Sequence, residues 1–184
     1  MNKIFQIQFQ FLPVEDRLLL RMNTTDKEEF SFFLTRRFVS LLYPILTKIL
    51  HADSCVNKPQ AEYLAGKSLN DNQIRNEMVK FQQQDSIEKT NTSIPYQNNG
   101  LSHPLGNDPI LLANISTNTD SGKLKLSLTP ELGQGVSFYM DKGLTHLFRN
   151  LLLESLKATG WQLKFPDDLV LSTLSVQSDK RVLH

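Results

Sequence analysis

Residues 29–50, EFSFFLTRRFVSLLYPILTKIL, change from strand spacing to helix spacing at a single residue. Before Thr35, the apolar residues Phe30, Phe32 and Leu34 fall at every second position, which is the period of a half-buried strand. After Thr35, apolar residues recur every three or four positions, as in an amphipathic helix. The Thr35 hydroxyl can accept a hydrogen bond from a free amide of the first turn, so we expect Thr35 to be the N-cap. This stretch therefore predicts a strand followed at once by a helix.

The same pattern returns 106 positions further on, in residues 135–156, GVSFYMDKGLTHLFRNLLLESL. Asp141 takes the place of Thr35 and is another good N-cap residue. The register also holds upstream without a gap, where Arg17 corresponds to Lys123. A shared register over a whole unit predicts an internal duplication.

The apolar stripe of each helix is expected to form the core. In the first helix it comprises Phe38, Leu41, Leu42, Ile45, Leu46, Ile49 and Leu50, and in the second Leu144, Leu147, Phe148, Leu151, Leu152, Ser155 and Leu156. Truncating Leu41 or Leu147 to alanine should therefore cost about 2–5 kcal/mol. Pro44 lies within the first helix and should kink it, because it removes a backbone donor.

Each copy contains three stretches with strand spacing. They are residues 4–11, 17–23 and 30–34 in the first copy, and 110–117, 123–129 and 136–140 in the second. In the first strand, Phe5, Ile7, Phe9 and Phe11 share one face. Because the connections are short, each set should form an antiparallel meander with its helix packed across the apolar face. The predicted fold class is α+β: two β-β-β-α repeats related by a pseudo-two-fold, with antiparallel sheets and packed helices.

The remaining residues divide the chain around these two units. We predict a first unit at 1–51, a polar insert at 52–107, a second unit at 108–160 and a C-terminal segment at 161–184, all within one compact domain. Within the insert, residues 70–89 have the spacing of an accessory helix, and the composition of residues 90–107 indicates poor order. The C-terminal segment alternates from Trp161 onward, which predicts either an extra strand pair or a tail that wraps back over the core.

Composition narrows the classes of protein to consider. The 184 residues carry a net charge of +1, so any nucleic-acid contact depends on a local basic patch. The single cysteine, Cys55, cannot form an intramolecular disulfide, which favours a reducing compartment. There is no apolar run long enough to span a bilayer, and the N-terminus alternates rather than forming a signal peptide. We therefore expect a cytoplasmic protein that does not enter a membrane.

Motifs that would indicate an enzyme are missing from the sequence. It contains no GxSxG, P-loop, dinucleotide-binding or HExxH pattern. Its four histidines are scattered without the spacing of metal ligands, and we interpret them as surface or helix-end residues. We expect no catalytic residue, metal or cofactor, although catalytic residues that converge from distant positions remain an alternative.

One group of side chains does suggest a function. Basic and aromatic residues gather on the meander faces opposite the helices and at the strand-to-helix corners: Arg17, Arg21, Phe33, Arg36, Arg37, Lys123, Lys125, Tyr139 and Lys142. Rings beside positive charges suit single-stranded DNA or RNA, because bases stack while phosphates are neutralised. Two alternatives remain. The face is an ordinary solvated surface, or it contacts a protein partner or a second copy, since Leu19 and Phe33 would otherwise be exposed.

Two successive meander-plus-helix units resemble a known architecture. It is the fold shared by plant Whirly proteins, kinetoplastid guide-RNA-binding proteins and the small single-stranded-DNA-binding transcriptional coactivators. The resemblance covers residues 4–50 and 110–156. It implies curved sheets that bind single-stranded nucleic acid and helices that pack as a two-fold core. The group has four strands per unit where three are found here. The Whirly strand motif KGKAAL has no full match, and GKLKL at residues 122–126 is its nearest counterpart.

Overall fold

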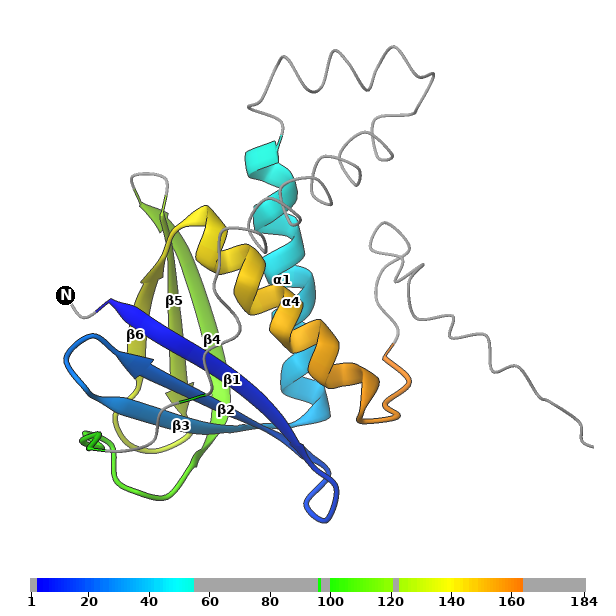
Figure 1. The fold of residues 1–184 in the computed structure, drawn as a ribbon. Helices are drawn as coiled ribbons and strands as arrows, with labels where there is room; N and C mark the ends of the chain where they lie inside the picture. The colour runs from blue at the N-terminus through cyan, green and yellow to red at the C-terminus, as the bar shows by residue number, and fades with distance from the viewer. Residues whose placement is uncertain (1–2, 55–95, 97–99, 121–122, 164–184) are drawn as a thin grey trace, which may run out of the picture.

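The described part of the chain forms one mixed sheet and two helices (Figure 1). The computed structural model describes residues 3–54, 96, 100–120 and 123–163. In chain order the elements are β1 (Ile4–Leu12), β2 (Arg17–Thr24), β3 (Glu29–Leu34), α1 (Arg36–Ser54), β4 (Ile110–Asp120), β5 (Lys123–Pro130), β6 (Val136–Met140) and α4 (Lys142–Lys157). Every strand and helix predicted within the two copies is present, and the class is α+β. The accessory helix predicted at residues 70–89 lies outside the described residues.

The six strands lie in the order β1-β2-β3-β4-β5-β6. Each predicted meander is antiparallel. Between them, β3 and β4 run parallel, with Phe32 opposite Ile110 and Phe33 opposite Leu111. The expected separate antiparallel sheets are therefore corrected to a single mixed sheet. The alternation of apolar and polar residues shows that a segment is a strand, but it does not show which other strand will pair with it. The pairing of β3 with β4 therefore could not be predicted from the sequence.

The chain before β4 also runs beside β3. The amide of Glu29 donates to the carbonyl of Ser102 at 2.8 Å, and the amide of Ser102 donates to the carbonyl of Lys27 at 2.8 Å. Residues 100–107, expected from their composition to be poorly ordered, thus include a segment held by backbone hydrogen bonds. A polar composition does not exclude order where a strand edge supplies partners.

The sheet curls around the core. In a flat sheet, β3 and β6 would lie about 14 Å apart, because neighbouring strands are separated by about 4.8 Å. The ring centroids of Phe30 and Phe138, on these two strands, lie 5.7 Å apart with an edge-to-face angle of 76°. Contact across three strand spacings requires the inner faces of β3 and β6 to turn toward each other.

Both helices complete this core, and they reach across to the opposite meander. The ring of Phe148 in α4 packs edge-on against Phe9 in β1, with centroids 5.2 Å apart. Helix α4 also contacts its own β5 and β6, while α1 contacts β4 (Figure 1). The predicted packing of each helix across its own meander is therefore extended by contacts with strands of the other meander. Two helices on one continuous curled sheet can each cover strands from both halves.

A partly buried polar contact joins the two helices. The guanidinium of Arg149 in α4 donates to the Tyr43 hydroxyl at 2.7 Å and to Oγ1 of Thr47 at 3.0 Å, both in α1. The same guanidinium lies 5.0 Å from the centre of the Tyr43 ring. Because Tyr43 and Thr47 are fully buried, these hydrogen bonds satisfy polar groups that would be costly to leave without partners.

Both predicted N-caps are confirmed. The amide of Phe38 donates to Oγ1 of Thr35 at 3.2 Å, and the amide of Leu144 donates to Oδ1 of Asp141 at 2.8 Å.

Trp161 does not begin a strand. Its ring instead packs edge-on against Phe11, and its indole N–H donates to Asp16. Trp161 therefore lies over β1 and the β1–β2 turn, while the rest of the C-terminal segment, for which a strand pair or a tail was predicted, lies outside the described residues.

Two residues predicted for the core lie outside it. Phe5 is 56% exposed, because a register shift between Ile4 and Gln6 turns it outward and buries Ile4 instead. Leu41 is 55% exposed. The buried face of α1 passes through Phe38, Val39, Leu42, Tyr43, Leu46, Thr47 and Leu50. It is rotated away from Leu41 toward the side that meets Arg149. Leu147 is only half-buried.

This rotation of α1 can be tested with two neighbouring leucines. Leu42→Ala should lower the free energy of unfolding by about 2–5 kcal/mol, because Leu42 is fully buried and its truncation leaves a cavity. Leu41→Ala is the matched control and should change stability by less than about 0.5 kcal/mol. Urea unfolding followed by circular dichroism measures both. Equal losses in the two variants would contradict the placement of α1.

Candidate functional site

Side chains that alternate with the core residues form the outer face of the sheet. In the first meander, cross-strand register places them in three rows: Gln10, Leu19 and Phe33; Gln8, Arg21 and Ser31; and Gln6, Asn23 and Glu29. We call these rows the first outer face. In the second meander the rows are Ser116, Ser127 and Ser137, and Asn118, Lys125 and Tyr139. These rows form the second outer face.

In each meander, a cation lies beside an aromatic ring of the outer face. The guanidinium of Arg17 lies 5.6 Å from the centre of the Phe33 ring. The ammonium of Lys125 lies 5.7 Å from the centre of the Tyr139 ring. Both distances fall within the range of a cation–π interaction. The structure thus brings together four of the residues that the sequence singled out, as two separate pairs.

Arg21, a third predicted residue, is engaged within the chain. Its guanidinium donates to Oε1 of Gln10 at 3.1 Å and lies 5.6 Å from the centre of the Tyr96 ring. Tyr96 comes from the segment between the two halves. Nothing in its local sequence, SIPYQNNG, distinguishes it from a loop tyrosine, so sequence reasoning missed this contact.

Tyr96 also reaches a buried carboxylate. Its hydroxyl donates to Oε2 of Glu29 at 3.1 Å, and the hydroxyl of Ser31 donates to Oε1 of Glu29 at 3.1 Å. Glu29 is only 7% exposed. Burial, followed by the nearby charge of Glu29 and the hydrogen bond to it, raises the pKa of Tyr96 above its usual value, whereas Arg21 acts in the opposite direction. Tyr96 therefore remains a hydrogen-bond donor at any physiological pH.

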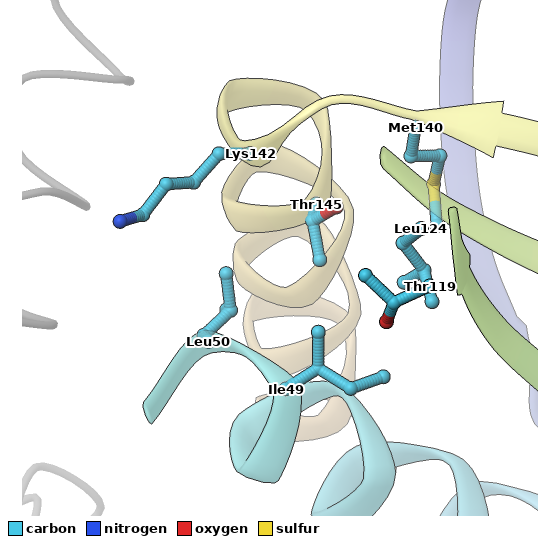
Figure 2. A pocket seen from close by; sticks show the side chains of 7 residues that line it. All are labelled: Ile49, Leu50, Thr119, Leu124, Met140, Lys142 and Thr145. Carbon is cyan, nitrogen blue, oxygen red and sulfur yellow. The ribbon is translucent and has the colours of Figure 1, made fainter. Parts of the chain in front are cut away.

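The other predicted residues lie apart from these pairs. Lys123 is exposed at the start of β5, and Arg36 and Arg37 are exposed at the start of α1. Arg36 donates to the carbonyl of Gln162 at 2.9 Å. Lys142 begins α4, and Figure 2 shows its side chain extending away from the sheet. It therefore belongs to the helix layer, not to the outer face.

The pocket beside Lys142 is too small to hold a substrate. It lies between the end of α1 and the start of α4, and is lined by Ile49, Leu50, Thr119, Leu124, Met140, Lys142 and Thr145 (Figure 2). Its volume of about 10 Å³ is roughly that of one water-sized probe. The pocket therefore suggests no ligand.

One histidine contradicts its interpretation as a surface residue. His146 is fully buried within α4, and among the described residues neither ring nitrogen has a hydrogen-bond partner. Asn150, one turn later, is buried in the same way, and its amide has no partner among those residues. Burial, and then the positive charges of Lys142 and Arg149, lower the pKa of His146 to about 4. The ring is thus neutral at physiological pH.

The lowered pKa of His146 predicts how stability depends on acid. Between about pH 6.5 and pH 4 the unfolded chain binds a proton that the folded chain does not, so stability should fall as the pH falls through this window. The slope cannot exceed about 1.4 kcal/mol per pH unit for one proton. Chemical unfolding at a series of pH values should show this fall in the wild type and a smaller one in His146→Gln. Parallel profiles for the two proteins would contradict the prediction.

The raised pKa of Tyr96 predicts how the free energy of unfolding changes at alkaline pH. Its pKa is raised above 10 in the folded state, so the unfolded chain loses the Tyr96 proton first. The stability that this contact provides should be present below pH 10 and decline as the pH rises above that value. Unfolding free energies of the wild type and Tyr96→Phe, compared from pH 8 to pH 11, measure the effect as a difference that shrinks with rising pH. A constant difference would mean that Tyr96 does not donate to Glu29.

The described residues show neither a membrane-spanning helix nor a cluster of metal ligands. None of the helices in that part of the chain is both long and apolar enough to cross a membrane. The same residues contain no group of three or more His, Cys, Asp or Glu side chains able to hold a metal ion. Comparison with protein-family models, with curated proteins and with solved structures finds no match to this chain.

Proposed function

We propose that this protein binds single-stranded DNA or RNA through the outer faces of its sheet, without catalysing a reaction. The observation that carries the proposal is the pairing of Arg17 with Phe33 and of Lys125 with Tyr139, one pair in each meander. Bases stack on aromatic rings whatever their sequence, and an adjacent cation neutralises the backbone phosphate. Both requirements are met by side chains on rigid strands.

The charge of the whole chain limits the expected affinity. With a net charge of +1, the protein has no long-range attraction for a polyanion. Binding would therefore depend on the few cations of the outer faces, with Arg36 and Arg37 as further phosphate contacts at the corner before α1. Such binding is modest and weakens with salt, because each neutralised phosphate releases counterions.

The internal duplication belongs to the same proposal. We infer that the two halves are β-β-β-α repeats related by a pseudo-two-fold, as in the Whirly-like architecture that the sequence resembles. The hydrogen bond between Tyr43 and Arg149 supports this, because it joins residues 106 positions apart. That separation equals the sequence offset between the copies, and equivalent positions of two repeats meet each other only near a two-fold axis.

A protein-binding role is the second candidate, and one observation favours it. Leu111 is 44% exposed and lies directly opposite Phe33 across the β3–β4 junction. Leu19 flanks Phe33 on the other side. These three side chains form an apolar strip on the outer face, and such strips are common where proteins associate. A partner protein or a second copy of this chain would cover it.

The proposal predicts which substitutions weaken binding. Phe33→Ala and Tyr139→Ala should each cost about 1–3 kcal/mol of binding free energy, as loss of a stacked base does. Arg17→Ala and Lys125→Ala should weaken binding and reduce the slope of log K against log salt by about 0.7 for each lost contact. Fluorescence anisotropy with labelled single strands, DNA and RNA, and a duplex control measures these changes.

Lys142→Ala provides the matched control for charge. It removes one cation from the helix layer, so it should leave the salt slope unchanged. If the wild type binds no single strand even at low salt, the nucleic-acid proposal is wrong. In that case, concentration-dependent sedimentation of the wild type and of Leu111→Ser would test whether the apolar strip joins two copies of the chain.

A further inference from the structure

The first outer face contains a site already shaped around an aromatic ring. The Tyr96 ring lies against the Arg21 guanidinium, and its hydroxyl donates to Glu29. Arg21 and Ser31 are opposite each other in the β2–β3 register, and Glu29 lies one row further along. A planar cation on one side and an acceptor at the end of the ring thus define the site.

Glu29 determines which chemical groups can bind in this site. An ionised carboxylate accepts hydrogen bonds and donates none, and its two oxygens offer about four lone-pair positions. Among the described residues, Ser31 and Tyr96 each donate one side-chain hydrogen bond to it. Because Glu29 is almost completely buried, any group that replaces Tyr96 must also donate, or the carboxylate would lose a partner at considerable cost.

We propose that this site binds a guanine base of a single-stranded nucleic acid, and that Tyr96 occupies the place of that base in the free protein. The inference rests on the proposed function and names the base that one of the two outer faces prefers. The inference is based on two neighbouring groups, the Arg21 guanidinium beside the ring and the buried Glu29 carboxylate at its end.

Guanine is the base whose Watson–Crick edge matches a carboxylate. Its N1–H and N2 amino group are adjacent donors, so both carboxylate oxygens can accept at once. Adenine and cytosine each place an acceptor nitrogen beside their amino group, and that nitrogen would face the Glu29 oxygens. Thymine and uracil offer one N–H between two carbonyls. Bidentate pairs of this kind discriminate strongly between bases.

Guanine and Tyr96 would compete for the same contacts. Both present a flat ring to Arg21, and flat rings stack well on a guanidinium. Tyr96 supplies one donor to Glu29, whereas guanine supplies two. Among the described residues, the buried Nε of Arg21 and Oε1 of Gln8 have no hydrogen-bond partner. These two residues are opposite each other in the β1–β2 register, so the site has polar groups that Tyr96 leaves unused.

Anisotropy measurements on the full chain test this inference. The probes are a labelled oligothymidine and the same strand with three thymines replaced by guanine, together with the equivalent RNA pair. Tyr96→Ala should tighten binding of the guanine strand roughly five-fold or more, with little effect on the thymine strand. Adding Glu29→Gln to Tyr96→Ala should remove this preference. Tyr96→Phe keeps the ring but loses the hydrogen bond, so it should shift the preference in the same direction by less.

Controls separate this inference from the function on which it rests. Glu29→Gln also removes a negative charge, so Glu131→Gln, at an exposed position, is the charge-matched control and should leave the preference unchanged. Tyr139→Ala should weaken binding of both strands equally.

The outcomes then separate the two proposals. If both strands bind but neither Tyr96 variant changes the ratio of their affinities, the guanine site is wrong and the general proposal stands. If neither the wild type nor any variant binds either strand, the proposed function is wrong and this inference is wrong with it. Should Tyr96→Ala not fold, as judged by thermal melting, the ratio for Tyr96→Phe decides.

Discussion

The parallel pairing of β3 with β4 is the constraint on which the rest of the structure depends. Two antiparallel meanders could each fold beside their own helix, but this pairing makes them one sheet. On the inner side it allows the sheet to curl until Phe30 meets Phe138. On the outer side it sets Phe33 beside Leu111, so that the first and second outer faces become continuous. The core and the candidate interface are consequences of the same junction.

A curled sheet leaves an opening that the helices must fill, and a polar contact sets how they do so. Arg149 lies between α1 and α4, with its charge directed at the Tyr43 hydroxyl and at Thr47. The hydroxyls of Tyr43 and Thr47 belong to fully buried residues, and buried polar groups are costly to separate from their hydrogen-bond partners, so few rotations of α1 are compatible with this contact. This is why the buried face of α1 includes Tyr43 and Thr47 and leaves the more hydrophobic Leu41 in solvent.

Much of the fold could be predicted from the sequence, because spacing is a local property. The alternation of Phe30, Phe32 and Leu34 and the caps at Thr35 and Asp141 locate elements without knowledge of their neighbours. The errors all involve partners. The Phe5 bulge, the rotation of α1 and the burial of His146 depend on what packs against each residue. At the candidate site, alternation predicted the outward side chains, whereas the contact of Tyr96 with Glu29 joins residues 67 positions apart and has no local signature.

The two outer faces are not equivalent, and this asymmetry bears on what the surface can do. The guanidinium of Arg21 lies 5.6 Å from the centre of the Tyr96 ring, whereas Ser127, 106 positions later in the second meander, hydrogen-bonds to Ser137 at 2.7 Å. The residue 106 positions after the buried Glu29 is Gly135. Two outer faces that bound a uniform strand in the same way would need the same groups on both. The first outer face combines the buried acceptor Glu29 with the cation of Arg21, so under the proposed function discrimination among bases would belong to that face. The second outer face offers the pair of Lys125 and Tyr139, which under the same proposal would hold a base without distinguishing one base from another.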